Sequence, residues 1–128
     1  MDLTFEIKKL VIGTLMNDSV VSSLVDPDRI YGNITPSNPG MTFIRCEGME
    51  AVPYNDSCGV GTEQAFRVHV FTDGEDTVAK IAAAVTNALN GAIGFLFIDW
   101  QLTQYLLDSE GEADAQHAAI DFDVAMTQ

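Results

Sequence analysis

The hydrophobic residues near the start of the chain recur at steps of three and four, which is the spacing of an amphipathic helix. Leu3, Ile7, Leu10, Val11 and Leu15 form this stripe. It predicts a helix over Leu3–Met16. Asp18 follows as a candidate N-cap, because a carboxylate there can accept from free helical N–H groups. A short second helix is expected to run from it to Val25.

A second helical stripe lies past the middle of the chain. Thr72 and Glu75 have the spacing of a capping box, and Asn90-Gly91 is typical of a helix end. We therefore expect a helix over Thr77–Leu89, reached through this acidic turn. Its apolar positions are Val78, Ile81, Ala82, Val85, Ala88 and Leu89.

Apolar and polar residues alternate in three other regions, which is the spacing of a half-buried strand. These regions are 64–71, 96–103 and 120–126. The last two predict a hairpin whose tip is the acidic segment 108–114. Two shorter strands are expected over Ile30–Ile34 and Met41–Met49.

Two loops are expected around these strands. Pro36 and Pro39 stiffen the connection between the two short strands. The segment Pro53–Gly61 is polar and contains two glycines. It predicts a loop that is mobile in the isolated chain and becomes ordered against a partner.

These elements predict a single domain over residues 1–128 of class α+β. We expect an antiparallel-rich sheet of four to five strands with two main helices packed on one face. Alternation along the strands also predicts which side chains approach the core. They are Val68, Val70, Ile98, Trp100, Phe122 and Val124.

Charge narrows the range of partners. The formal net charge is −13, with only six basic residues. Phosphate groups would be repelled, which argues against general binding to nucleic acid and against an anionic membrane surface. No apolar run is long enough to cross a bilayer, and the N-terminus lacks the pattern of a signal peptide. Cys46 and Cys58 are expected to be free thiols.

No set of residues indicates catalysis, and we expect no enzyme activity, no cofactor and no metal site. His69 and His117 are expected to be partly exposed sheet residues. Asp121 and Asp123 lie on one face of the last strand. They could hold a hard cation, but we favour the simpler explanation that they form the solvated polar face of an amphipathic strand.

Several short segments of the sequence occur in an order that is typical of one protein family. The segment "LVDPDRIYGNITPSNPGMTFIRCE" has a turn after a helix, the word "RIY" at 29–31 and a proline-containing loop before a strand. The segments "FRVHVFTDGEDTVAKIAAAVTNALNG" and "AAIDFDVAM" follow in the expected places. From about Leu3 to Met126 the chain resembles the small tail-completion proteins, or tail terminators, of long-tailed bacteriophages. Pro39 departs from the pattern, since two residues separate it from Thr42.

The resemblance implies a structural protein of the virion. Such proteins form a ring, usually six-fold, on the head-proximal end of the tail tube. The ring ends tube polymerisation and joins the tube to a neck or head-completion protein. The chain would be assembled in the cytoplasm of the bacterial host and would lie at the tail–neck junction, with DNA passing through the ring unbound.

Two groups of residues are candidates for roles in such a ring. Scarce positive charges, stiff prolines and polar loop residues would suit contacts between subunits, although the prolines could equally only shape a surface connection. These interface candidates are Arg29, Tyr31, Pro36, Pro39, Arg45, Tyr54, Asn55 and Asp56. Acids could line the channel or only keep the subunit soluble. These lumen candidates are Glu110, Glu112, Asp114, Asp121 and Asp123.

An acidic inhibitor or DNA mimic, acting on a DNA-binding enzyme, is the alternative function. The net charge fits such a protein. Many of the acids, however, lie at turns and helix starts, whereas a mimic usually spreads them over its surface. Size would distinguish the two hypotheses, because a mimic is expected to be a monomer or dimer.

Overall fold

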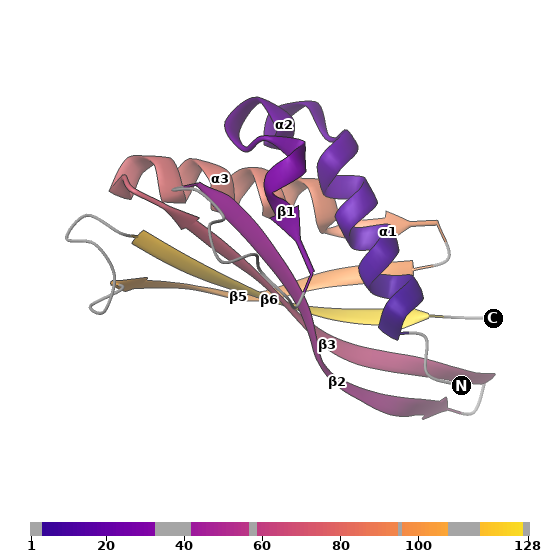
Figure 1. The fold of residues 1–128 in the computed structure, drawn as a ribbon. Coiled ribbons are helices and arrows are strands. Elements are labelled where there is room, and N and C mark those ends of the chain that lie inside the picture. The colour runs from indigo at the N-terminus through magenta and orange to yellow at the C-terminus, as the bar shows by residue number, and fades with distance from the viewer. Residues whose placement is uncertain (1–3, 33–41, 57–58, 95, 108–115, 127–128) are drawn as a thin grey trace.

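A computed structural model of the chain describes residues 4–32, 42–56, 59–94, 96–107 and 116–126, with the side chains at 4, 49–56, 59–63, 107 and 126 left out. Three α-helices lie on one face of a strongly curved sheet (Figure 1). The predicted class, α+β, is confirmed. So is the packing of the two main helices on one face of the sheet, where α1 (Thr4–Asn17) covers one half of that face and α3 (Glu75–Leu89) covers the other half.

Within the described residues the sheet has six strands, one or two more than expected. Their order is β1-β2-β3-β6-β5-β4, and every pair is antiparallel except β1 with β2. The C-terminal strand therefore lies inside the sheet, between β3 and β5. The strands are β1 (Ile30–Tyr31), β2 (Phe43–Asp56), β3 (Gly59–Thr72), β4 (Gly91–Ile93), β5 (Leu96–Leu107) and β6 (Gln116–Met126).

The turn between the first helices forms as Asp18 predicts. Asp18 accepts hydrogen bonds at 3.0 Å from the backbone N–H groups of Val20 and Val21, which begins α2 (Ser19–Leu24). Asp26 accepts from Asp28 N in the same way at the 3-10 helix η1 (Pro27–Arg29). Each carboxylate satisfies N–H groups that have no partner inside the helix.

The expected cap of α3 is wrong. Thr72 belongs to β3, is buried, and its hydroxyl lies 2.9 Å from that of Thr42. The residue before the helix is Gly74, which makes no side-chain cap. Thr72 continues the buried alternation of β3, so it packs as a strand residue, and its hydroxyl is hydrogen-bonded to Thr42, which comes just before β2.

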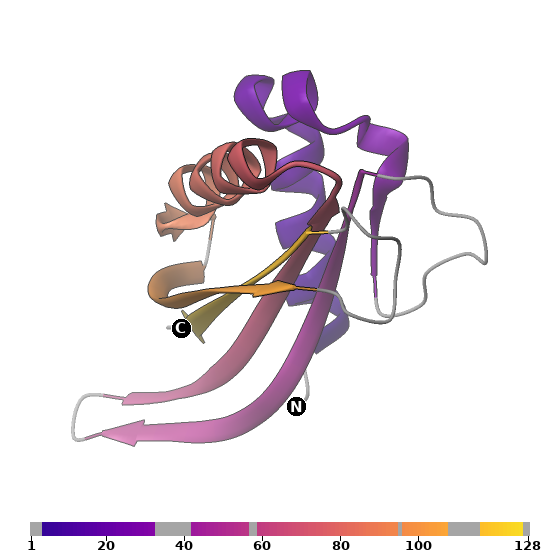
Figure 2. The same ribbon diagram turned by 90° about the vertical axis from the view of Figure 1, so that its left-hand side faces the viewer.

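The loop expected over Pro53–Gly61 is also wrong. β2 and β3 continue through it as one long hairpin, paired as far as Asp56 with Gly59, and the hairpin extends beyond the helical layer (Figure 2). Pro53 is tolerated because β1 pairs only with Ile44 and Arg45, which leaves the outer edge of β2 open at the proline. Polar residues and glycines indicated a loop, but an extended hairpin accommodates them as well.

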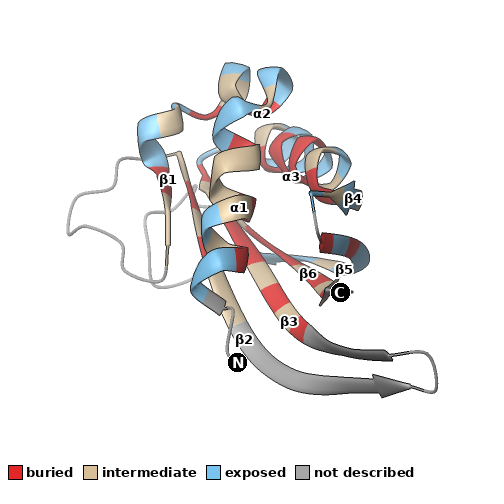
Figure 3. Ribbon diagram, turned by 90° about the vertical axis from the view of Figure 1, so that its right-hand side faces the viewer, coloured by how far each residue is buried: buried red, intermediate tan, exposed pale blue. Residues whose placement is uncertain are grey.

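The core lies between the helices and the sheet, where buried residues of both layers face one another (Figure 3). Five of the six residues expected near it are buried. Trp100 is the exception, with 47% of its surface exposed. The register between β5 and β6 shifts between Trp100 and Leu102, and this bulge follows the point where β4 stops covering β5.

Candidate functional site

The face of the sheet opposite the helices carries a connected row of polar side chains; we call it the open face. Alternation places Glu47 of β2, His69 of β3 and His117 of β6 on it, in neighbouring strands. His69 Nε2 lies 2.9 Å from Glu47 Oε1, and His69 Nδ1 lies 2.8 Å from His117 Nε2. The row therefore crosses three strands by hydrogen bonds.

These contacts shift the protonation of the row. His69 is buried, not partly exposed as expected. Burial lowers its pKa, and the charges of Arg45 and Arg67 add to this, while the hydrogen bond to Glu47 opposes it. Partial burial acts to raise the pKa of Glu47, but the hydrogen bond from His69 and nearby positive charge outweigh it, so the pKa is lowered. We infer a neutral His69 that donates to an ionised Glu47.

One ion pair lies beside this row. Arg67 donates from Nε to Asp121 Oδ1 at 2.6 Å and from Nη2 to Oδ2 at 3.1 Å. The residues face one another directly in the β3–β6 register. The hydrogen bond with Asp121 raises the pKa of Arg67. Of the two lumen candidates on β6, Asp121 is therefore neutralised.

Asp123 has the opposite surroundings. It lies directly opposite Asp99 of β5, and it makes no ion pair within the described part of the chain. Two carboxylates in facing positions concentrate negative charge at this end of the open face. Sequence alternation put Asp121 and Asp123 on the same face, but only the strand register separates a paired acid from an unpaired one.

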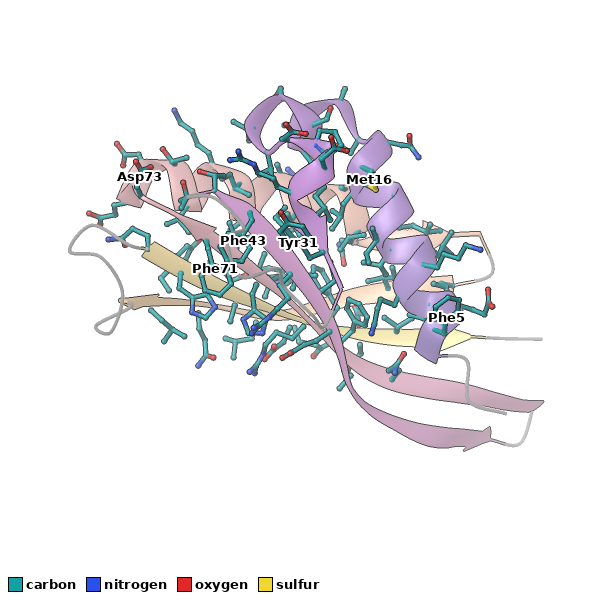
Figure 4. All side chains as sticks on the ribbon, in the orientation of Figure 1. Phe5, Met16, Tyr31, Phe43, Phe71 and Asp73 are labelled. Atoms are coloured by element: carbon teal, nitrogen blue, oxygen red, sulfur yellow. The ribbon has the colours of Figure 1, made fainter. Side chains whose placement is uncertain are left out.

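An aromatic cluster continues the open face at the β1 edge. Phe71 stacks on His117 at 4.3 Å and on Phe43 at 4.6 Å between ring centroids, and Tyr31 lies 6.1 Å from Phe43 (Figure 4). Arg45 lies over the Phe71 ring at 5.8 Å. Its buried Nε has no hydrogen-bond partner among the described residues.

The remaining interface and lumen candidates are described by the structure to different extents. Arg29 is exposed at the end of η1, and Tyr31 is half-buried in β1, beside Arg45 in the register. Tyr54, Asn55 and Asp56 lie in the far part of the β2 backbone, with side chains outside the described residues. Pro36, Pro39, Glu110, Glu112 and Asp114 lie wholly outside them.

The described residues do not bring together the groups of a reactive centre. No group of three His, Cys, Asp or Glu side chains in this part of the chain is placed to hold a metal ion. Cys46 is a free thiol whose pKa burial raises to about 12. Such a group stays protonated and unreactive at neutral pH. Within the same residues, no helix is both long and apolar enough to cross a membrane.

The sequence profile of the family described as tail completion protein gp17 matches residues 9–127. The chain belongs to this family. The sequence resemblance is thereby confirmed, and the chain is a structural protein of a virion tail. Among curated proteins, none matches the chain in sequence.

Solved structures agree on the fold. Thirty-three solved chains match. One is a chain from the "virion of native gene transfer agent (GTA) particle", with a TM-score of 0.77 and 23% sequence identity, over 94% of this chain and 93% of that one. At that identity the likeness establishes the shared fold. The assignment of the chain to the virion tail rests on family membership.

Sequence reasoning missed two features of this family member. One is the Glu47–His69–His117 row, which depends on the pairing of β3 with a strand 48 residues away. The other is the set of exposed apolar side chains on the two faces of β5. Its signal was present in the sequence, since Phe97, Trp100, Leu102, Tyr105 and Leu106 are too many large residues for one buried strand face.

Proposed function

We propose that the chain forms a ring, six-fold in symmetry, on the head-proximal end of the phage tail tube. The ring ends polymerisation of the tube and joins the tail to a neck or head-completion protein. Membership of the tail completion family, matched over residues 9–127, is the observation that carries this proposal. The related fold in a gene transfer agent virion supports it.

The open face suits the wall of a channel for DNA. Its central histidine is kept uncharged by burial, and its Arg67 is held by Asp121, so that this guanidinium is not free for phosphates. Asp99 and Asp123 leave negative charge where no counter-charge is described. DNA is retained by lysine and arginine and repelled by carboxylates. We assign Asp123 to the lumen, add Asp99, and keep Glu110, Glu112 and Asp114 as further candidates.

We place the contacts along the tail axis on the long β2–β3 hairpin. β2 and β3 extend past the last residue of β6, which pairs with Thr62, so the segment beyond has no third strand. A two-stranded arm of this kind gains stability when it packs on a partner. We assign Tyr54, Asn55 and Asp56 to a contact with the tube or neck protein. Arg29, Tyr31, Arg45, Pro36 and Pro39 are assigned to contacts between subunits.

The alternative, an acidic inhibitor or DNA mimic, is supported by net charge alone. A mimic needs carboxylates spaced over a surface like the phosphates of a duplex. Here Asp121 is paired with Arg67, and Asp18 and Asp26 cap helices. The family match gives this function no support.

Imaging of intact particles tests the proposal. Particles assembled with a chain that carries a small added tag are labelled at the tag and examined by electron microscopy. We expect label only at the junction of tail and head. Label along the whole tube, at the distal tip, or absent from particles would contradict the proposed position.

A further inference from the structure

Large apolar side chains are exposed at two separate places on the described surface. Five of the eight lie on β5, and the other three lie on α1 and α2. Soluble chains seldom gather so many on one strand without a partner. The members on β5 are Phe97, Trp100, Leu102, Tyr105 and Leu106, and those on the helices are Phe5, Met16 and Val20.

The first place is a groove between α3 and the second half of β5, which we call the α3–β5 groove. β4 pairs with β5 only as far as Ile98, and among the described residues no strand covers the outer edge of β5 beyond that point. The groove is a hollow of 610 Å³ beside this edge, and its lining is mainly apolar. It is lined by Glu75, Val78, Ala79, Tyr105, Leu106 and Gln116.

The charge at this groove is negative. Glu75 lines it, and Asp76 follows in the first turn of α3, with Asp73 just before the helix. All three acids are exposed. No basic residue lines the groove. Alanine at position 79 leaves room beside the helix for a large side chain from outside.

The second place is the outer side of α1, which we call the α1 knob. Phe5, Lys8, Lys9, Ile12, Gly13 and Met16 line a shallow hollow there, and the name refers to the exposed side chains of Phe5 and Met16 among them. Phe5 is 72% exposed, the highest value among the large apolar residues. Lys8 and Lys9 are two of only six basic residues in the chain. An apolar knob flanked by scarce lysines is complementary to an apolar groove flanked by acids.

The two surfaces lie at opposite ends of the molecule. Figure 4 shows Phe5 near one end and Asp73, at the start of α3, near the other. α1 packs over β1 and β2, whereas β5 lies on the far side of the sheet order. Two different surfaces at opposite ends favour a head-to-tail contact, in which each copy uses its knob on one neighbour and its groove on another. Each copy that docks leaves one knob and one groove free, and such head-to-tail contact closes into a ring when the rotation permits.

We infer that the α1 knob of one copy docks in the α3–β5 groove of the next. Phe5 and Met16 cover the exposed Tyr105 and Leu106, while Lys8 and Lys9 face the acids at the start of α3. The inference rests on the proposed ring and names the surfaces that close it. A competing contact, the open edge of β5 against the open edge of β2, is an outcome that the test below can reveal.

Two blocked variants test this contact in purified protein. Phe5→Asp removes the knob, and an acid in the first turn of α1 is favourable for the helix, so the fold is retained. Ala79→Arg fills the groove from an exposed helical position. Matched controls are Val20→Asp, also apolar to acid in a first helical turn, and Ser23→Arg on α2. Circular dichroism confirms that each variant is folded.

Sedimentation velocity over a concentration series then gives the size of each species. We expect the wild-type chain and both controls to form species larger than a dimer, and each blocked variant alone to stay monomeric. An equimolar mixture of the two blocked variants keeps one intact knob and one intact groove, so it should form a dimer and nothing larger.

Three results would overturn the inference. They are a wild-type chain that is monomeric at every concentration, a mixture that forms no dimer, and blocked variants that still assemble as the wild type does. The last result would indicate pairing of strand edges. None of these results bears on where the chain lies in the particle, because the labelling experiment tests that position separately.

Discussion

His69 Nδ1 lies 2.8 Å from His117 Nε2, while the other ring nitrogen of His69 lies 2.9 Å from Glu47 Oε1. A neutral His69 that carries its proton on Nε2 donates to Glu47 and accepts from His117. Protonation of His69 would place a second proton between the two rings. The row is therefore satisfied when His69 is uncharged.

Stability should consequently fall as the pH is lowered. The pKa of His69 is lowered from 6.5 in the folded chain, so the unfolded chain binds a proton first. The stability that neutral His69 contributes to the folded chain is fully present above pH 6.5. It is lost as the pH falls from 6.5 through the lower pKa of His69 in the folded state. The pKa of Glu47 is lowered from 4.5, and its contribution is lost further down in the same direction. Urea unfolding across this range measures the effect.

His69→Gln is the variant that isolates the histidine. Glutamine can still donate to Glu47, but it does not titrate. We expect a smaller loss of stability between neutral pH and pH 5 than in the wild type. A slope equal to that of the wild type would show that His69 titrates alike in both states.

The pair of Arg67 and Asp121 should contribute modestly to stability. Both side chains are partly exposed, at 30% and 21%, so water and salt screen the pair. We expect Asp121→Asn to lower the free energy of unfolding by about 0.5–1 kcal/mol, less at high salt. Asp123→Asn is the matched control, since it relieves repulsion from Asp99 and should be neutral or stabilising. An equal loss in both variants would mean that the ion pair contributes nothing.

The core assignment predicts larger effects. Phe122 and Ile81 are 1% and 0% exposed, on β6 and α3. Each change to alanine should cost about 2–5 kcal/mol, because it removes buried apolar surface and leaves a cavity. Phe97→Ala, on the exposed side of β5, should cost far less. Chemical denaturation measures all three, and losses below about half a kcal/mol at Phe122 and Ile81 would place them outside the core.

The lumen assignment predicts an effect on the departure of DNA. Replacing Asp99 and Asp123 together by lysine would put two positive charges on the open face. Ejection from assembled particles should become slower at low salt and recover as salt is added, since counterions weaken lysine–phosphate contacts. The triple change to lysine at Glu110, Glu112 and Asp114 tests the hairpin tip in the same way.

Asp28→Lys with Ser19→Lys and Ser23→Lys is the control for that experiment. All three residues are exposed on the helical side of the molecule and outside the proposed subunit contact, and the net charge changes equally. Ejection should stay as in the wild type. If the control slows ejection as much as the open-face variant does, total charge and not position is responsible.

The sequence predicted much of the fold because local patterns determine it. The stripes of α1 and α3, the cap at Asp18 and the alternation of β3 and β6 each follow from residues close in the chain. The errors arose where neighbouring strands decide. Thr72 had capping spacing but is held by Thr42, and Trp100 fits a buried pattern that a bulge interrupts.

The candidate site was less predictable for the same reason. Asp121 and Asp123 have the same spacing and the same face, and only the register shows that one faces Arg67 and the other Asp99. The histidine row likewise joins residues that are 22 and 48 positions apart. Strand pairing at such distances leaves no periodic signal in one sequence.

The length of tails made without this chain tests the central claim most directly. Infected cells that lack the chain, and cells that have it restored, are compared by electron microscopy of the tails they produce. If the ring ends polymerisation and joins the tube to the neck, tails without it should be longer than normal, variable in length and free of heads, and restoration should return both features. Tails of normal, uniform length that remain joined to heads would contradict the account.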